Sequence, residues 1–171
     1  MRIFLIGLPG SGKSTIGRQL ALSLKLKFID TDEEIISEQK KSIEDIFKAH
    51  GEDHFRKLEH EILKKVSQET DVIVSTGGGT PCFYNNTDII NEAGISIFLN
   101  VPVETIYRRM LGQKDSNRPM LHNKTDEEIF DFLKTKLSER LEYYSKAKLE
   151  FSGSDITAKE ILEKLKSERF I

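Results

Sequence analysis

Short runs of β-branched and aliphatic residues alternate along the chain with longer segments that have the periodicity of amphipathic helices. The short runs predict buried strands of a parallel sheet at residues 2–6, 27–29, 72–75, 96–100 and 149–152. The periodic segments predict helices at residues 13–24, 42–67, 86–92, 103–111, 126–146 and 157–168. Because strand and helix alternate, we expect a doubly wound α/β fold with right-handed crossovers.

Two stretches are longer than this alternation requires. Residues 31–65 exceed the length of one crossover helix, so we expect them to form a subdomain beside the sheet. Phe47 and Phe55 within this stretch fit either a helical core or the wall of an apolar pocket. Residues 112–124 (GQKDSNRPMLHNK) are polar and contain glycine and proline, which is typical of a lid or a disordered segment. We interpret this second stretch as a mobile lid.

Composition and charge fit one compact domain. The chain has 171 residues, 37% of them hydrophobic and 32% charged, which suits one core and leaves no room for a second full domain. The 26 basic and 28 acidic residues give a net charge of −2, so we expect no nucleic-acid or membrane partner. No signal-peptide pattern and no apolar run of membrane length are present, and Cys82 is the single cysteine. We therefore expect a cytoplasmic protein, and a monomer.

The most specific motif is GLPGSGKS at residues 7–14, which fits the pattern GxxxxGK[ST] between an apolar strand and an amphipathic helix. In this context backbone N–H groups form an anion-binding nest at a helix N-terminus. Lys13 is placed to reach the β- and γ-phosphates of ATP, and Ser14 to ligate Mg²⁺. We expect the nucleotide to contact Gly10, Ser11, Gly12, Lys13, Ser14 and Thr15. The motif alone does not choose between a kinase, an ATPase and a GTPase.

A second pattern, NKTD at residues 123–126, resembles the guanine-recognition motif of G proteins. In G proteins that motif ends a buried strand, whereas here it follows a polar loop. Thr125 and Glu128 instead have the spacing of a capping box, in which two side chains satisfy N–H groups at a helix start. We therefore expect a helix to begin here, and we reject the guanine interpretation.

Two carboxylates follow the second strand, at the sheet edge where ligands bind in open α/β folds. We expect Asp30 to face the phosphate-binding loop, where it holds Mg²⁺ through water or orients the attacking hydroxyl. We expect Asp32 to bind hydroxyl groups of a second substrate. The alternative for both residues is structural, an Asx turn and a helix N-cap ahead of Glu33.

Three consecutive glycines, Gly77, Gly78 and Gly79, follow the third strand at the same edge. Such a run costs backbone entropy unless something approaches the backbone closely. We expect a ligand ring or carboxylate to lie against this backbone. A tight strand-to-helix turn is the alternative.

Three arginines are candidates for holding an anionic group, because arginine binds carboxylate or phosphate bidentately. These are Arg56, Arg118 in the predicted lid, and Arg140. Arg56 and Glu59 are three residues apart on a predicted helix, so Glu59 can brace the guanidinium. Taken singly, each arginine also fits a solvated surface charge.

Across essentially the whole chain, the motifs GLPGSGKS, DTD, FRKLE, STGGG, RPML and RLEYY resemble those of the shikimate kinase family, in the same order. The resemblance implies a three-layer P-loop kinase fold like that of nucleoside monophosphate kinases. In this fold a five-stranded parallel sheet is flanked by helices, a shikimate-binding insertion spans about residues 33–62, and a lid spans about residues 112–124.

The resemblance also implies residue roles. The catalytic residues would be Lys13, Asp30 and Arg118, and Mg²⁺ would be held near Ser14 and Asp30. Shikimate would contact Asp32, Arg56, Gly77, Gly78, Gly79 and Arg140. Arg109 would pack on the adenine and Arg118 would approach the transferred phosphate, with Arg108 as the alternative to Arg109.

The expected function is phosphorylation of the shikimate 3-hydroxyl by ATP, giving shikimate 3-phosphate and ADP in aromatic amino-acid biosynthesis. A gluconate kinase shares the P-loop and the need for an anion clamp, but the DTD, FRKLE and TGGG motifs argue against it. A non-catalytic nucleotide switch is a second alternative. A switch has no use for an acid pair and three separated arginines at the ligand edge.

Overall fold

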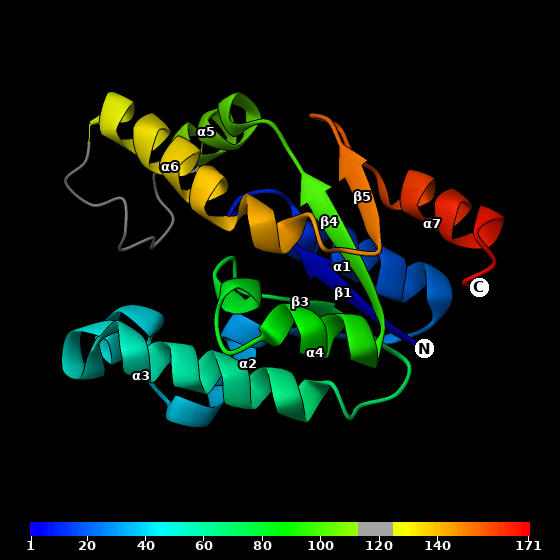
Figure 1. Ribbon diagram of the computed structural model, residues 1–171, viewed down its shortest axis with the longest axis horizontal. Coiled ribbons are helices and arrows are strands. Elements are labelled where there is room, and N and C mark those ends of the chain that lie inside the picture. The colour runs from blue at the N-terminus through cyan, green and yellow to red at the C-terminus, as the bar shows by residue number, and fades with distance from the viewer. Residues whose placement is uncertain (113–124) are drawn as a thin grey trace.

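The computed structural model describes residues 1–112 and 125–171. In these residues a parallel five-stranded sheet has the order β2-β3-β1-β4-β5 (Figure 1). Its strands are β1 (Arg2–Ile6), β2 (Lys27–Asp30), β3 (Val72–Ser75), β4 (Ile95–Asn100) and β5 (Leu149–Ser152). The predicted α/β fold class is therefore confirmed, and each predicted strand is present to within one residue at its ends.

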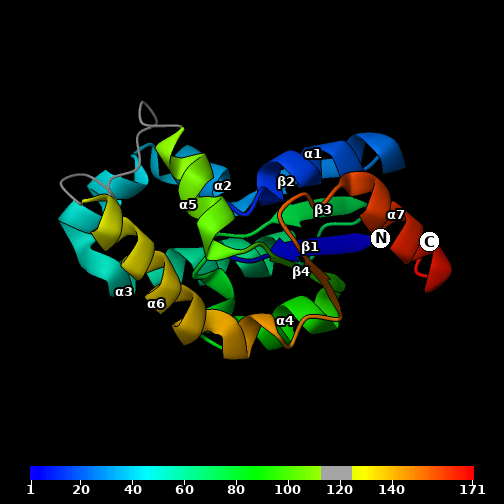
Figure 2. The same ribbon diagram turned by 90° about the horizontal axis from the view of Figure 1, so that it is seen from above.

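Helices cover both faces of this sheet. They are α1 (Lys13–Leu24), α2 (Thr31–Gln39), α3 (Ile43–Val66), α4 (Asn86–Ala93), α5 (Val103–Leu111), α6 (Asp126–Tyr144) and α7 (Ala158–Ser167), with a 3₁₀ turn, η1 (Thr80–Cys82). In Figure 2, α1 and α7 lie on one side of the sheet and α4 lies on the other. The result is the expected three-layer arrangement.

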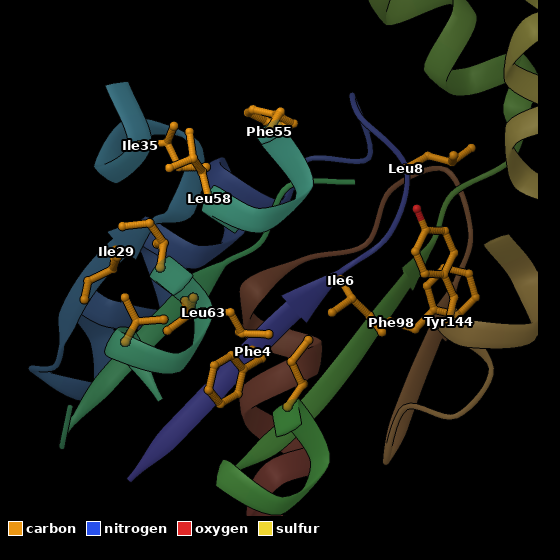
Figure 3. Packing of buried hydrophobic residues seen from close by; sticks show 14 of the residues in the cluster. Phe4, Ile6, Leu8, Ile29, Ile35, Phe55, Leu58, Leu63, Phe98 and Tyr144 are labelled. Carbon is orange, nitrogen blue, oxygen red and sulfur yellow. The ribbon is translucent and has the colours of Figure 1, made fainter. Parts of the chain in front are cut away.

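The alternation of side chains in β1 divides the core between the two faces. Ile3 and Leu5 point toward the layer formed by α1 and α7, where they join one apolar cluster. Phe4 and Ile6 point to the opposite face and join a larger cluster that reaches Tyr144 of α6 (Figure 3). Because the strand is buried on both sides, it reads as a continuous apolar run rather than as an alternating one.

The long connection between β2 and β3 contains two helices where the sequence predicted one. Helix α2 was not predicted, because its sequence TDEEIISEQ carries too few apolar residues to show a helical stripe. Its start is stabilised instead by Asp30, whose side chain accepts a hydrogen bond from the Asp32 N–H, and by acidic residues in its first turn. The N-cap is therefore Asp30, one of the two residues for which a structural role was considered.

Helix α3 contains a break at Gly51, which has φ 78° and ψ 178°. Phe47 and Phe55 lie on either side of this break, and their ring centroids are 4.6 Å apart. Phe55 is 5% exposed and belongs to the core (Figure 3). Phe47 is partly buried against the same core. Of the two possibilities considered for these residues, a helical core and the wall of a pocket, the core describes Phe55.

Helix α6 begins at the predicted capping box. The Thr125 N–H donates to Glu128 Oε2 at 2.6 Å, and the Glu128 N–H donates to Thr125 Oγ1 at 3.2 Å. Asp126 is therefore the first residue of a helix, which agrees with rejecting the guanine motif. Among the described residues, no helix combines the length and the apolar character needed to cross a membrane.

Candidate active site

The phosphate-binding loop connects β1 to α1 and takes its shape from glycines. Gly7, Gly10 and Gly12 have φ values of 142°, 84° and 96°. Residues that carry a Cβ rarely adopt this backbone conformation. Lys13 folds back over the loop, and its Nζ donates to the carbonyl oxygens of Gly7 at 2.9 Å and Leu8 at 2.8 Å. The ammonium group is thereby held over the loop whose N–H groups form the expected anion nest.

Ser14, in the first turn of α1, joins this loop to the ends of two strands. Its hydroxyl donates to Asp30 Oδ2 at 2.6 Å and lies 3.2 Å from the hydroxyl oxygen of Ser75. Asp30 and Ser75 are register partners at the carboxyl ends of β2 and β3. A carboxylate and a hydroxyl beside a phosphate nest are the hard oxygen ligands that Mg²⁺ prefers, so these residues fit the expected ion.

A cavity of about 530 Å³ opens beside the loop. It is lined by Gly10, Ser11, Gly12, Lys13, Ser14, Thr15, Ile16, Gln19, Val101, Arg109, Met110, Ile156 and Thr157. All six loop residues expected to contact the nucleotide, residues 10–15, are therefore in its wall. A second cavity of about 640 Å³, over β5 and α7, shares only Ile156 with the first and includes no residue of the loop.

Of the two arginines proposed for the adenine, Arg109 faces the nucleotide cavity and Arg108 does not line it. Nη2 of Arg109 donates to the Ser154 carbonyl oxygen at 2.6 Å, and Nη1 lies within 3.5 Å of the Gly10 and Ser11 carbonyl oxygens. Arg108 is exposed and bonds only weakly to the Glu104 carbonyl oxygen. The geometry therefore favours Arg109.

The glycine run 77–79 lies against side chains of the site, which explains why glycine is needed there. A Cβ on Gly77 would be 2.5 Å from Glu59 Oε1 and 2.8 Å from Asp32 Oδ1. A Cβ on Gly78 would be 2.6 Å from Cδ of Pro9, in the phosphate-binding loop, and one on Gly79 would collide with the guanidinium of Arg56. The close approach expected from the sequence is thus made by the protein's own side chains, which are charged at Gly77 and Gly79 and apolar at Gly78.

Arg56 is held by two carboxylates and an aromatic ring. Its Nη1 donates to Glu59 Oε2 at 2.5 Å, as the sequence spacing predicted. Its Nε and Nη2 donate to Oε1 of Glu52 at 3.1 and 2.9 Å, and its Cζ lies 4.5 Å from the Phe83 ring centroid. Burial disfavours the charge, but Glu59 and Glu52 outweigh this effect and raise the pKa of Arg56 above its ordinary value. The guanidinium is therefore charged and fixed in orientation.

Arg140 of α6 also approaches the glycine run. Its Nη1 lies 3.2 Å from the Cβ position of Gly78. Tyr144, one turn later, donates its hydroxyl to the Gly78 carbonyl oxygen at 2.5 Å and fixes the run to α6. Burial raises the pKa of the Cys82 thiol to about 11, against the opposing fields of Arg140 and Arg56. Both arginines therefore act at the same location, although they come from helices far apart in the sequence.

Asp32 lies between the two halves of the site. Its Oδ1 is buried and has no hydrogen-bond partner among residues 1–112 and 125–171. Burial raises the pKa of Asp32 to about 7, with further increases from Asp30 and Glu59 and opposing effects from Lys13 and Arg56. A buried acceptor without a partner is costly, so it indicates a position that a ligand hydroxyl would satisfy.

The expected site residues in the described part of the chain therefore converge on one edge of the sheet. Arg118, and the predicted lid apart from Gly112, lie outside the described residues. Glu52, Phe83, Ser75 and Tyr144 were given no role in the sequence analysis. Ser75 and Tyr144 stand within the quoted motifs STGGG and RLEYY, and Glu52 precedes Arg56 by four residues on the same helix. Phe83 carried no such signal.

Comparison with known proteins identifies this arrangement. The family model described as shikimate kinase matches residues 9–168 of the chain. The shikimate kinase of Phocaeicola vulgatus is 44% identical over 158 residues, which cover 92% of this chain and 90% of that protein.

Solved structures give the same result. The crystal structure of shikimate kinase from Bacteroides thetaiotaomicron aligns with a TM-score of 0.92 at 35% identity, covering 100% of this chain and 99% of that one. Shikimate kinase from Acinetobacter baumannii in complex with shikimate aligns with a TM-score of 0.86 at 30% identity, covering 99% and 92% of the two chains. The chain is thus similar over its length both to named enzymes and to their structures.

Proposed function

The chain belongs to the shikimate kinase family and phosphorylates shikimate with ATP, and we propose that the residues described above carry out this transfer to the 3-hydroxyl group. The products are then shikimate 3-phosphate and ADP. The observation that supports this assignment best is the buried Oδ1 of Asp32, which has no hydrogen-bond partner among the described residues and lies 2.8 Å from the Cβ position of Gly77. A ligand hydroxyl at this position would satisfy that oxygen.

The nucleotide half of the proposed site uses backbone and cationic groups. The N–H groups of the loop and the ammonium of Lys13 bind and orient the phosphates, and Arg109, in the wall of the cavity, contacts the base. Positioning and charge neutralisation supply most of the rate enhancement in phosphoryl transfer, because the transition state needs little covalent help. Two contacts support this role: Lys13 Nζ is held over the loop by the Gly7 and Leu8 carbonyl oxygens, and the Ser14 hydroxyl bonds to Asp30.

We infer that Mg²⁺ is the cofactor, with Ser14 and Asp30 as the protein groups that hold it directly or through water. When bound, the ion neutralises charge on the phosphate oxygens. The Ser14–Asp30 hydrogen bond of 2.6 Å supports this assignment, because it places the two oxygen ligands together beside the loop.

The acid half of the proposed site uses Arg56 and Arg140 as a carboxylate clamp across the glycine run. Asp32 accepts a hydrogen bond from a substrate hydroxyl, and in its ionised form it can accept the proton of the attacking hydroxyl. Its unpartnered Oδ1 supports this role within the described residues. We further propose a cytoplasmic monomer, and size-exclusion chromatography tests the oligomeric state.

A substrate panel tests the assignment. ADP release is followed in a coupled assay with shikimate, gluconate and nucleoside monophosphates as acceptors. We expect turnover with shikimate alone. Turnover with gluconate and none with shikimate would identify a gluconate kinase, and nucleotide binding that is insensitive to either acid would identify a switch.

A further inference from the structure

The guanidinium of Arg56 has few donors left for an incoming carboxylate. Glu59 takes Nη1, and Oε1 of Glu52 takes both Nε and Nη2, which form the side-on pair that binds carboxylates bidentately. One face of the group is covered by Phe83, and Gly79 contacts it on another side. A substrate carboxylate can therefore use the side-on pair only after Glu52 has moved away.

The local charge leads to the same conclusion. Two carboxylates on one guanidinium give a net negative group, and Asp32 adds a third carboxyl nearby. A substrate carboxylate that approaches Arg56 is repelled by these carboxylates unless one of them moves away. Arg56 is thus electrostatically satisfied as it stands, and the positive charge of Arg140 lies beside the same glycine run.

Only one of the two carboxylates on Arg56 can move at low cost. The Glu59 side chain is 2% exposed and also accepts a hydrogen bond from Thr80 Oγ1 at 2.6 Å, so displacing it would leave a buried charge unpaired. The Glu52 side chain is 58% exposed and can rotate into water. Glu52 also follows the helix break at Gly51, where an added Cβ would meet no other part of the described chain within 4 Å.

We propose that Glu52 is a specificity-determining residue that occupies the substrate carboxylate's place on Arg56 and is exchanged for it on binding. Every acid that uses this edge of Arg56 must displace Glu52, whereas a neutral analogue leaves Glu52 in place. Glu52 thus lowers the affinity for acids and sets how strongly the site prefers an acid over its uncharged counterpart. The inference rests on the proposed function, since it concerns the shikimate carboxylate.

The test compares binding of shikimate and of its neutral carboxamide by isothermal titration calorimetry. Glu52→Gln keeps the shape of the side chain and removes its charge. We expect the variant to bind shikimate about two- to fivefold more tightly than the wild type, the range set by a solvent-exposed ion pair. Binding of the carboxamide should not change. Asp53→Asn is the matched control, because it removes a charge from the neighbouring exposed residue and should leave both affinities nearly unchanged.

The outcomes separate the competing accounts. Weaker binding of shikimate to Glu52→Gln would mean that Glu52 only orients Arg56, and would overturn the inference. An equal gain in Asp53→Asn would assign the effect to the general field and would also overturn it. If the wild type binds shikimate and Glu52→Gln binds it no more tightly, this inference alone is refuted. If the wild type does not bind shikimate, the proposed function is refuted as well. Because the glutamine oxygen can still accept a hydrogen bond from Arg56, the comparison is repeated with Glu52→Ala. Thermal unfolding curves that match the wild type show that this variant is folded.

Discussion

The hydroxyl of Ser14 donates a 2.6 Å hydrogen bond to Oδ2 of Asp30. This bond joins the first turn of α1, which carries the phosphate-binding loop, to the last residue of β2. Asp30 is also the N-cap of α2, and the Asp32 N–H is its capping donor. The position of the acid-binding half is thereby fixed relative to the nucleotide half by one side chain.

Replacing Asp30 tests this connection. Asp30→Asn keeps a good N-cap and removes the charge beside Ser14, so we expect kcat to fall by about 100-fold with little loss of stability. Steady-state kinetics and thermal unfolding measure the two effects. Glu33→Gln, which removes a charge from the exposed first turn of α2, is the control and should retain activity. An unchanged kcat in Asp30→Asn would remove Asp30 from the catalytic residues.

Replacing Arg56 tests the acid clamp. Arg56→Ala is expected to raise KM for shikimate by about 10- to 100-fold, the value of a charge-assisted bidentate contact, with little change in KM for ATP. Because the change leaves Glu59 buried without its cation, Arg56→Lys is measured beside it to separate folding from binding. Lys57→Ala removes a neighbouring exposed charge and should behave as the wild type. Equal losses for both substrates would show that the clamp is misplaced.

The two neighbouring arginines of α5 give opposite expectations. Arg109 lines the nucleotide cavity, so Arg109→Ala should raise KM for ATP by about three- to tenfold, in the range of a stacked cation. Arg108→Ala removes the same charge one residue away on the exposed side and should have almost no effect. Initial rates at varied ATP measure both. The reverse order of effects would make Arg108 the adenine contact.

The titration of Asp32 predicts a pH-dependent stability. Its pKa rises from 3.8 to about 7 on folding, chiefly through burial, so between these values the folded protein holds a proton that the unfolded chain has lost. Stability of the wild type should therefore fall as the pH rises through this range, by up to about 1.4 kcal/mol per pH unit. Asp32→Asn lacks this penalty and should be the more stable protein near pH 8, with an advantage that shrinks toward pH 4.

Urea unfolding of both proteins at several pH values, without nucleotide or metal, measures this difference. The control is Asp53→Asn, an exposed site where the difference from wild type should be the same at each pH. A difference between Asp32→Asn and the wild type that does not depend on pH would show that Asp32 titrates normally.

The sequence predicted the fold well because its signals are local. Strand runs such as Val72–Ser75 and the capping box at Thr125 are decided by a few neighbouring residues. Helix α2 escaped prediction because its stability comes from the Asp30 cap and its acidic first turn rather than from an apolar stripe.

The site was predicted residue by residue only where a motif carried it. Glycine at 77–79 suggested a close approach, but the identity of the neighbours, Arg56, Glu59 and Pro9, depends on how distant segments pack. The Phe83 ring reaches Arg56 from a separate turn, and no spacing rule connects the two residues. Contacts of this kind follow from tertiary structure and could not be derived from one sequence.

The position of the new phosphate on the product tests the central claim most directly. The protein is incubated with shikimate, ATP and Mg²⁺, and the product is analysed by phosphorus–proton correlation NMR. The phosphorus should couple to the proton on carbon 3, with ADP formed in equal amount. Phosphate on another hydroxyl, or ADP formed with free inorganic phosphate and unchanged shikimate, would contradict the account.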